Sequence, residues 1–169
     1  MRIRPEEPPD ADAIAAVVLH AFGEHDEGPV VVRLVELLRS SPGYRPELAL
    51  VADDVDGVVG HVMFTDAEFE GATVLILSPL AVRPDRQRTG IGSALVGEGL
   101  ARAEATGVPL VVVEGDPRYY SRFGFRRALE LGIEKPRETT PEWAFQALAF
   151  TPEHPRGKFG YTRPFDEVE

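Results

Sequence analysis

A glycine turn next to basic residues is the part of this sequence best suited to binding chemistry. Residues 85–100 read DRQRTGIGSALVGEGL, which places Arg86 and Arg88 just before Gly90 and Gly92 at the start of an apolar helical pattern. A turn from a strand into a helix directs free backbone N–H groups and the positive helix end at one point. The glycines leave that point clear of side chains, and arginines add charge-assisted hydrogen bonds. The turn therefore predicts an anion site, most simply one for phosphate.

Two common phosphate-binding loops fit this turn poorly. A Walker A loop requires GxxxxGK[ST], and no lysine follows a suitable glycine here. A dinucleotide-binding fingerprint requires GxGxxG, but Leu95 stands at the third glycine position and no early N-terminal strand precedes the turn. A tight strand-to-helix turn without a ligand stays open, because short glycine patterns recur by chance.

The elements that must position this turn follow from the spacing of apolar residues. A strand buried on both faces is expected over 72–82, and Pro79 within it cannot donate to a sheet, which predicts an interruption or bulge there. A helix over 91–106 separates this strand from another at 108–115, so the two are expected to run parallel. The other expected elements are strands at 2–4, 47–54, 58–69 and 143–150 and helices at 11–22, 30–39 and 116–123. Together they predict an α/β fold in a single domain, residues 1–169, with its core at about 2–150 and a C-terminal extension at 151–169.

Composition narrows the classes of function. The 169 residues contain 43% hydrophobic residues, no cysteine and a net charge of −10. No apolar run approaches the ~20 residues that cross a bilayer, and the N-terminus lacks a signal-peptide core, so a cytoplasmic protein without a membrane partner is expected. The acidic balance argues against nucleic-acid binding; it serves solubility or attracts a cationic molecule. Disulfides and cysteine-ligated metals are excluded, no histidine pair has metal-ligand spacing, and no metal site is predicted.

Two motifs in this frame resemble the GNAT superfamily of N-acetyltransferases. Residues 87–92, QRTGIG, are similar to its acetyl-CoA signature Q/R-x-x-G-x-G/A, and residues 119–125, YYSRFGF, are similar to its Tyr-x-x-x-Gly-Phe motif. The order of elements matches over about residues 2–150. Residues 58–64 and 114–125 resemble, more narrowly, the bacterial predicted acetyltransferases of the YhbS type. The resemblance implies a mixed, mostly antiparallel sheet with a splayed parallel strand pair and helices on both faces.

The resemblance also implies acetyl-CoA as the co-substrate, with no metal. The pantetheine arm would lie along the strand that ends at the turn, and a backbone N–H near Leu80 or Ala81 would polarise the thioester carbonyl. The pyrophosphate would lie on the N–H groups of residues 88–93. The implied cofactor-binding residues are Leu80, Ala81, Val82, Gln87, Arg88, Thr89, Gly90, Ile91, Gly92 and Ser93.

Tyr120 matches the tyrosine that protonates the leaving thiolate in this family, and a phenol near pKa ~10 is a competent donor. Packing against its aromatic neighbours is the alternative, and a shift of register would exchange its role with that of Tyr119. The general base is less well marked, because 74–82 carries no glutamate where some members of the family have one. Glu114 is the preferred base, since it ends a strand where α/β active sites gather.

Further candidates for a base or for acceptor binding also fit plain structural roles. His61 is expected to be a hydrogen-bonded strand histidine rather than a base. The loop residues Glu24, His25 and Glu27 would attract a cationic amine if they border the site, and are otherwise a solvated cluster.

These inferences converge on an N-acetyltransferase that moves the acetyl group of acetyl-CoA directly to a primary amine of a small molecule or peptide. A non-catalytic acyl-CoA-binding or regulatory module is the main alternative, and a phosphate-responsive interaction protein is a third. The amine, the acyl-chain preference and the oligomeric state, including a homodimer, stay open.

Overall fold

The apolar segments of the chain come together in a seven-stranded sheet with the order β1-β2-β3-β4-β5-β8-β6. The computed structural model describes residues 1–168. Its strands are β1 (Arg2–Pro5), β2 (Tyr44–Asp54), β3 (Gly57–Phe69), β4 (Ala72–Val82), β5 (Leu110–Glu114), β6 (Arg126–Arg127), β7 (Ile133–Glu134), β8 (Phe145–Ala149) and β9 (Gly157–Lys158). Its α-helices are α1 (Ala11–Phe22), α2 (Gly28–Arg39), α3 (Ile91–Ala105), α4 (Pro117–Tyr120) and α5 (Arg163–Glu167).

The sheet is antiparallel except at its centre. β4 and β5 run parallel because the chain crosses from one to the other through α3, while the neighbouring pairs β3–β4 and β5–β8 are antiparallel. This mixed sheet with one parallel pair confirms the fold class predicted from the sequence.

The parallel pair separates soon after it forms. β4 and β5 pair only at Leu75–Val111 and Ile76–Val112. On its other edge β4 pairs with β3, but the register shifts between Val62–Leu80 and Phe64–Leu77, which leaves two residues of β4, Ser78 and Pro79, opposite one residue of β3. The peptide bond between them is cis. Because proline has no N–H, it cannot contribute to the β-ladder, and the interruption expected at Pro79 is confirmed.

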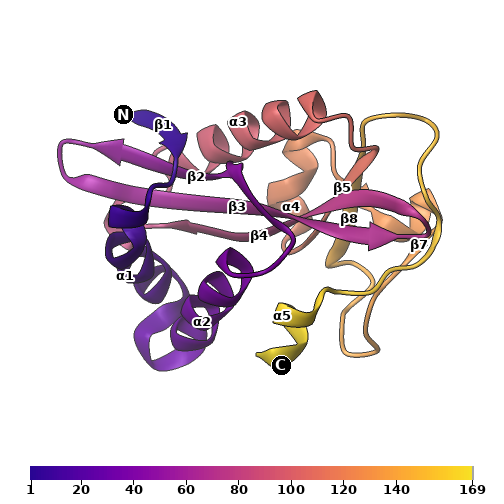
Figure 1. The fold of residues 1–169 in the computed structure, drawn as a ribbon, viewed down its shortest axis with the longest axis horizontal. Helices are drawn as coiled ribbons and strands as arrows, with labels where there is room; N and C mark the ends of the chain where they lie inside the picture. The colour runs from indigo at the N-terminus through magenta and orange to yellow at the C-terminus, as the bar shows by residue number, and fades with distance from the viewer. Residues whose placement is uncertain (169) are drawn as a thin grey trace.

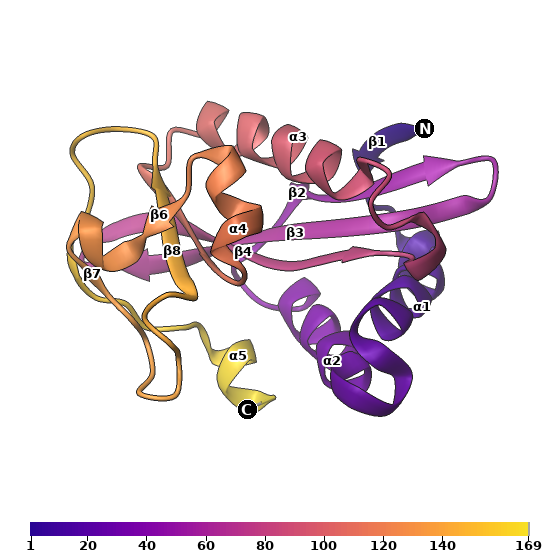
Figure 2. The ribbon, with the colours of Figure 1, turned by 180° about the vertical axis from the view of Figure 1, so that it is seen from behind.

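Helices cover both faces of the sheet (Figure 1). α1, α2 and α5 lie on one face, and α3 and α4 lie side by side on the other, as the reverse view also shows (Figure 2). Each face has its own cluster of buried apolar side chains, one built on Leu34, Met63 and Ile76 and the other on Phe64 and Leu95. None of the helices within residues 1–168 is long and apolar enough to cross a membrane.

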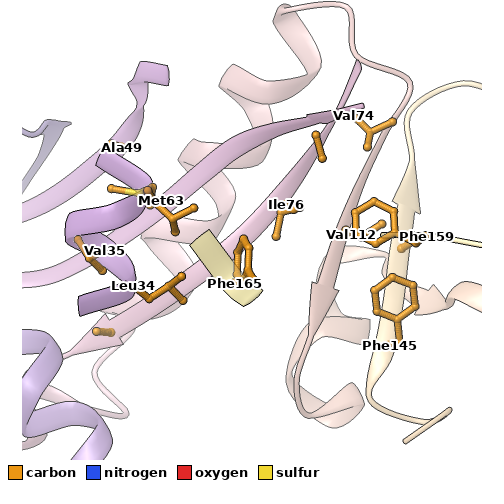
Figure 3. Close-up of a cluster of buried hydrophobic side chains, with 14 of the residues drawn as sticks. Leu34, Val35, Ala49, Met63, Val74, Ile76, Val112, Phe145, Phe159 and Phe165 are labelled. Atoms are coloured by element: carbon orange, nitrogen blue, oxygen red, sulfur yellow. The ribbon is translucent and has the colours of Figure 1, made fainter. Parts of the chain in front are cut away.

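The C-terminal segment belongs to the core rather than extending from it. Phe159 is 1% exposed and Phe165 is 8% exposed, and both join the cluster on the α1 and α2 face. Phe165 points from α5 toward Ile76 and Leu34 (Figure 3), while β9 pairs in parallel with β7. The expected end of the core near residue 150 is therefore wrong. Single aromatic residues among prolines, glycines and charged residues give no periodicity from which their burial could be predicted.

Candidate active site

The glycine turn brings unpaired backbone donors to the start of α3. Gly90 caps the helix with a φ of 95°, in the left-handed region that favours glycine, and its carbonyl accepts the first helical hydrogen bond, from the N–H of Ala94, at 3.0 Å. The N–H groups of Ile91, Gly92 and Ser93 therefore have no partner within the helix. Gln87 fixes the turn by donating from Nε2 to the carbonyl oxygen of Val82 at 3.0 Å. The turn is thus fixed, and these three N–H groups all point away from the start of α3.

A pocket of about 590 Å³, here called the turn pocket, lies at this point. It is lined by eight of the predicted cofactor-binding residues, namely Leu80, Ala81, Val82, Gln87, Arg88, Gly90, Gly92 and Ser93. The side chains of the other two point elsewhere. Ile91 is 6% exposed within the core, and Thr89 donates its hydroxyl to the carbonyl oxygen of Arg86, so both contribute to the turn through the backbone.

The arginines that line the turn pocket are not the pair expected from the sequence. Arg86 forms ion pairs with Asp54 and Asp56 of the β2–β3 hairpin and does not line the turn pocket, so its predicted part in the anion site is wrong. Arg88 lines the pocket and has no ion-pair partner among residues 1–168. The second pocket arginine is Arg122, which donates from Nη2 to the hydroxyl of Ser93 at 3.2 Å. Sequence reasoning missed it, although it lies inside the YYSRFGF motif.

Gly92 keeps the wall of the turn pocket open. A Cβ atom at this position would lie 2.7 Å from the hydroxyl oxygen of Tyr119, well inside van der Waals contact. The Tyr119 ring in turn packs under the Arg122 guanidinium, whose carbon lies 4.5 Å from the ring centroid. Tyr119 therefore contributes to the pocket as well as to packing.

A second cavity, here called the splay cleft, opens where β4 and β5 diverge. It has a volume of about 410 Å³ and is lined from β4 by Pro79 and Leu80, from the end of β5 by Glu114, and from α4 by Tyr120. Phe22 of α1 and Leu80 also line the turn pocket, so the two cavities adjoin along β4. The structure thus brings the predicted acid and base residues into one cleft beside the glycine turn.

Tyr120 is held by close aromatic packing. Its ring lies edge-on to Tyr119 and Phe125, with centroid separations of 5.0 and 5.7 Å, and a Cβ at Gly115 would lie 2.6 Å from it. Burial raises the pKa of the Tyr120 phenol above its ordinary value, and neighbouring Tyr119 adds to that increase. The phenol is therefore protonated at neutral pH.

Glu114 is oriented by two hydroxyl groups from segments far from it along the chain. Tyr161 donates to Oε1 at 2.9 Å and Thr140 donates to the same oxygen at 3.3 Å. Burial, followed by the charge of Glu114, raises the pKa of Tyr161 above its ordinary value, so this phenol stays a donor. Both hydrogen bonds end on one oxygen, and none from residues 1–168 occupies Oε2.

The remaining candidates lie away from this arrangement. His61 is fully buried in β3 with its Nε2 2.9 Å from Oε1 of Glu6, a carboxylate that also accepts hydrogen bonds from Arg39 and Tyr44. Burial alone would raise the pKa of Glu6, but the hydrogen bonds from His61 and Arg39 outweigh it and lower that pKa to about 2. His61 is thus part of a buried network. Three exposed residues lie at the α1–α2 connection, namely Glu24, His25 and Glu27. Their side chains line neither the turn pocket nor the splay cleft.

Comparison with known proteins places this geometry in a family. An acetyltransferase (GNAT) domain matches residues 45–127, a segment that includes the glycine turn and the YYSRFGF motif. The uncharacterized N-acetyltransferase YjhQ of Escherichia coli is 35% identical over 152 residues, which span 85% of this chain and 82% of that protein. The chain belongs to the GNAT acetyltransferase family.

Solved structures support the same conclusion for this GNAT acetyltransferase. The crystal structure of YhbS from Escherichia coli, a complex with CoA, aligns with a TM-score of 0.87 and 32% identity over 98% of this chain and 91% of that one. A GNAT acetyltransferase from Brucella melitensis in complex with acetyl-CoA aligns with a TM-score of 0.80 and 34% identity over 98% and 97% of the two chains. The family resemblance predicted from the sequence is confirmed, and the protein is an N-acetyltransferase.

Proposed function

We propose that this GNAT acetyltransferase transfers the acetyl group of acetyl-CoA directly to a primary amine of a small molecule or peptide. The observation that carries the proposal is the divergence of β4 and β5 after Ile76 and Val112, which opens the splay cleft beside the turn pocket. A thioester that runs from one cavity to the other would place its carbonyl next to Tyr120 and Glu114.

The turn pocket suits the phosphate-bearing half of acetyl-CoA. The free N–H groups at the start of α3 would bind the pyrophosphate, and Arg88 and Arg122 would supply positive charge in an otherwise acidic protein. Beyond Ile76, the edge of β4 that faces β5 is without a strand partner. Its backbone groups are therefore available to the amides of the pantetheine arm, and the complexes of the two relatives with CoA and acetyl-CoA support this assignment.

We assign the leaving-group proton to Tyr120. The amine nitrogen forms a bond to the acetyl carbon, the carbon–sulfur bond breaks, and the departing thiolate takes the proton of the Tyr120 phenol. Burial keeps the Tyr120 phenol in its protonated form, which is the form that can donate as charge develops on sulfur.

Glu114 is the proposed base. A cationic amine must lose one proton before it attacks, and the Glu114 carboxylate can accept this proton directly or through a water molecule. The second proton, lost from nitrogen as the amide forms, restores the Tyr120 phenol. Hydrogen bonds from Thr140 and Tyr161 hold Oε1, so Oε2 is the oxygen available to the acceptor. Glu114 also lies close to the surface, where a cationic amine can approach it.

The test compares the two adjacent tyrosines in an assay of CoA thiol release with a panel of primary amines. Tyr120→Phe is expected to lower kcat by about 100-fold, the usual scale of general acid catalysis, with little change in the KM for acetyl-CoA. Tyr119→Phe serves as the matched control and is expected to act mainly on that KM, since its hydroxyl faces the turn pocket. A loss of kcat in Tyr119→Phe alone would exchange the two roles. Failure to acetylate any amine while acetyl-CoA still binds would overturn the proposed function.

A further inference from the structure

A third cavity adjoins the splay cleft on the far side of Glu114. It has a volume of about 610 Å³ and shares Glu114, Gly115 and Asp116 with the splay cleft. Its remaining walls are mostly apolar and include Pro117, Pro141 and Trp143. We call it the tryptophan hollow. A molecule whose amine lies at Glu114 in the splay cleft would have space for its other end here.

The indole that gives the hollow its name is exposed. Trp143 is the one tryptophan of the sequence, and 52% of its surface is exposed. Within residues 1–168 its ring pairs with no other aromatic ring and stacks under no arginine or lysine. A large aromatic face that stacks on no other ring or cation of residues 1–168, at the rim of a cavity, is a surface suited to stacking against a ligand.

The wall that carries Trp143 is fixed to the sheet. The N–H of Gly115 donates to the carbonyl oxygen of Ala144 at 2.9 Å, and the Nε2 of buried Gln146 donates to the carbonyl oxygen of Gly115 at 3.1 Å. These bonds tie the residue after Trp143 to the end of β5. The indole is therefore presented at a defined distance from Glu114 rather than on a loose loop.

The charges around the hollow set the direction in which an amine would bind. Asp116 accepts hydrogen bonds from the backbone N–H of Arg118 and from its guanidinium, at 2.9 to 3.2 Å, so its charge is already balanced. Among residues 1–168, the Glu114 carboxylate receives hydrogen bonds only from the neutral hydroxyl groups of Thr140 and Tyr161. The unbalanced negative charge lies at the junction with the splay cleft. The rest of the lining is apolar apart from Arg118, whose guanidinium is paired with Asp116.

We infer that the tryptophan hollow is an acceptor subsite that selects primary amines carrying an aromatic group. The amine would face Glu114 and the aromatic ring would stack on Trp143 between Pro117 and Pro141. This inference rests on the proposed function, because it names the class of amine that the same site acetylates. It assigns specificity to Trp143 and leaves proton transfer to other residues.

The single tryptophan allows a direct binding test on the intact protein. With CoA bound, phenethylamine is expected to change the fluorescence of Trp143 in a saturable manner, whereas ethylamine, which lacks the ring, is expected to change it little. An equal response to both amines, or a response to putrescine that exceeds both, would overturn the inference. The putrescine result would indicate that a second positive charge, rather than an aromatic ring, is recognised.

Kinetics with acetyl-CoA provide the second readout. Trp143→Ala is expected to raise the KM for phenethylamine about tenfold more than the KM for ethylamine, in line with the loss of an aromatic contact. Leu129→Ala is the matched control, because Leu129 is exposed to a similar extent, 56%, and lines none of the three cavities. Equal changes for both amines in Trp143→Ala would refute the subsite. If no amine is acetylated, the proposed function fails, and the fluorescence titration still decides whether the hollow binds an aromatic amine.

Discussion

Alanine substitutions along α3 provide a test of the turn pocket in which the effect on folding and the effect on binding can be separated. Gly92, Gly97 and Gly99 all lie within this helix. Replacing glycine by alanine in a helix removes the same backbone entropy cost, about 0.5–1 kcal/mol, at each position. Differences between the three variants therefore report what the added methyl group meets.

The structure assigns a different environment to each methyl group. A Cβ at Gly97 has no atom within 4 Å, so Gly97→Ala should stabilise the fold by about 0.5–1 kcal/mol. A Cβ at Gly99 would lie 2.2 Å from Cε1 of the fully buried Phe64, and overpacking of this kind costs about 1–3 kcal/mol. At Gly92 the close atom, 2.7 Å away, is the terminal hydroxyl of Tyr119, which can move aside. Gly92→Ala should therefore fold with nearly the stability of the original protein.

Binding should rank the variants in another order. Gly92→Ala places a methyl group at the first turn of α3 and displaces Tyr119, so we expect acetyl-CoA to bind about tenfold more weakly, a loss of about 1.4 kcal/mol. Gly97→Ala should bind it as the original protein does. Thermal unfolding gives the stabilities, with about 2–4 °C in Tm for each kcal/mol in a chain of this size, and calorimetric titration gives the affinities. Equal affinity for acetyl-CoA in Gly92→Ala and Gly97→Ala would refute the assignment of the turn as the phosphate site.

Two further predictions concern charged side chains. Arg122→Ala should weaken acetyl-CoA binding about tenfold, the scale of a charge-assisted hydrogen bond, whereas Arg86→Ala should leave it within about twofold because Arg86 is paired with Asp54 and Asp56. Calorimetric titration measures both affinities. Equal losses of acetyl-CoA affinity in the two variants would contradict the assignment of Arg122, and not Arg86, to the turn pocket. For Glu6, whose pKa falls from 4.5 to about 2 on folding, the carboxylate stabilises the fold above its unfolded pKa, and roughly 3 kcal/mol is lost as the pH drops through that interval. Glu6→Gln should lack this part of the pH dependence in denaturant unfolding, and parallel curves for the two proteins would disprove the argument.

Features that depend on residues adjacent to one another in the chain could be predicted from the sequence. The glycine turn, the interruption at Pro79 and the YYSRFGF motif each follow from the chemistry of a few consecutive residues. Apolar periodicity located the long strands and helices for the same reason. The two-residue strands β6, β7 and β9 are too short to show a period, and they were missed.

Contacts between distant segments could not be predicted in the same way. Tyr161 is 47 residues from Glu114, and Glu6 is 55 residues from His61. Arg86 looked like part of an anion site because its true partners, near residue 55, lie on a hairpin that only the folded chain brings beside it. A single sequence shows which side chains can form hydrogen bonds and ion pairs. Which of them come into contact depends on how the folded chain packs.

The extra residue in β4 also decides which side chains the strand presents to each face. Before the bulge, the even-numbered Val74 and Ile76 point into the cluster under α1 and α2, and the odd-numbered Leu75 and Leu77 point toward α3. After it the order is reversed, since Leu80 and Val82 pack on the α3 side and Ala81 on the other. Removing or adding one residue at Ser78–Pro79 would exchange the two faces of everything that follows up to the glycine turn. This short stretch is therefore constrained in length more strictly than in composition.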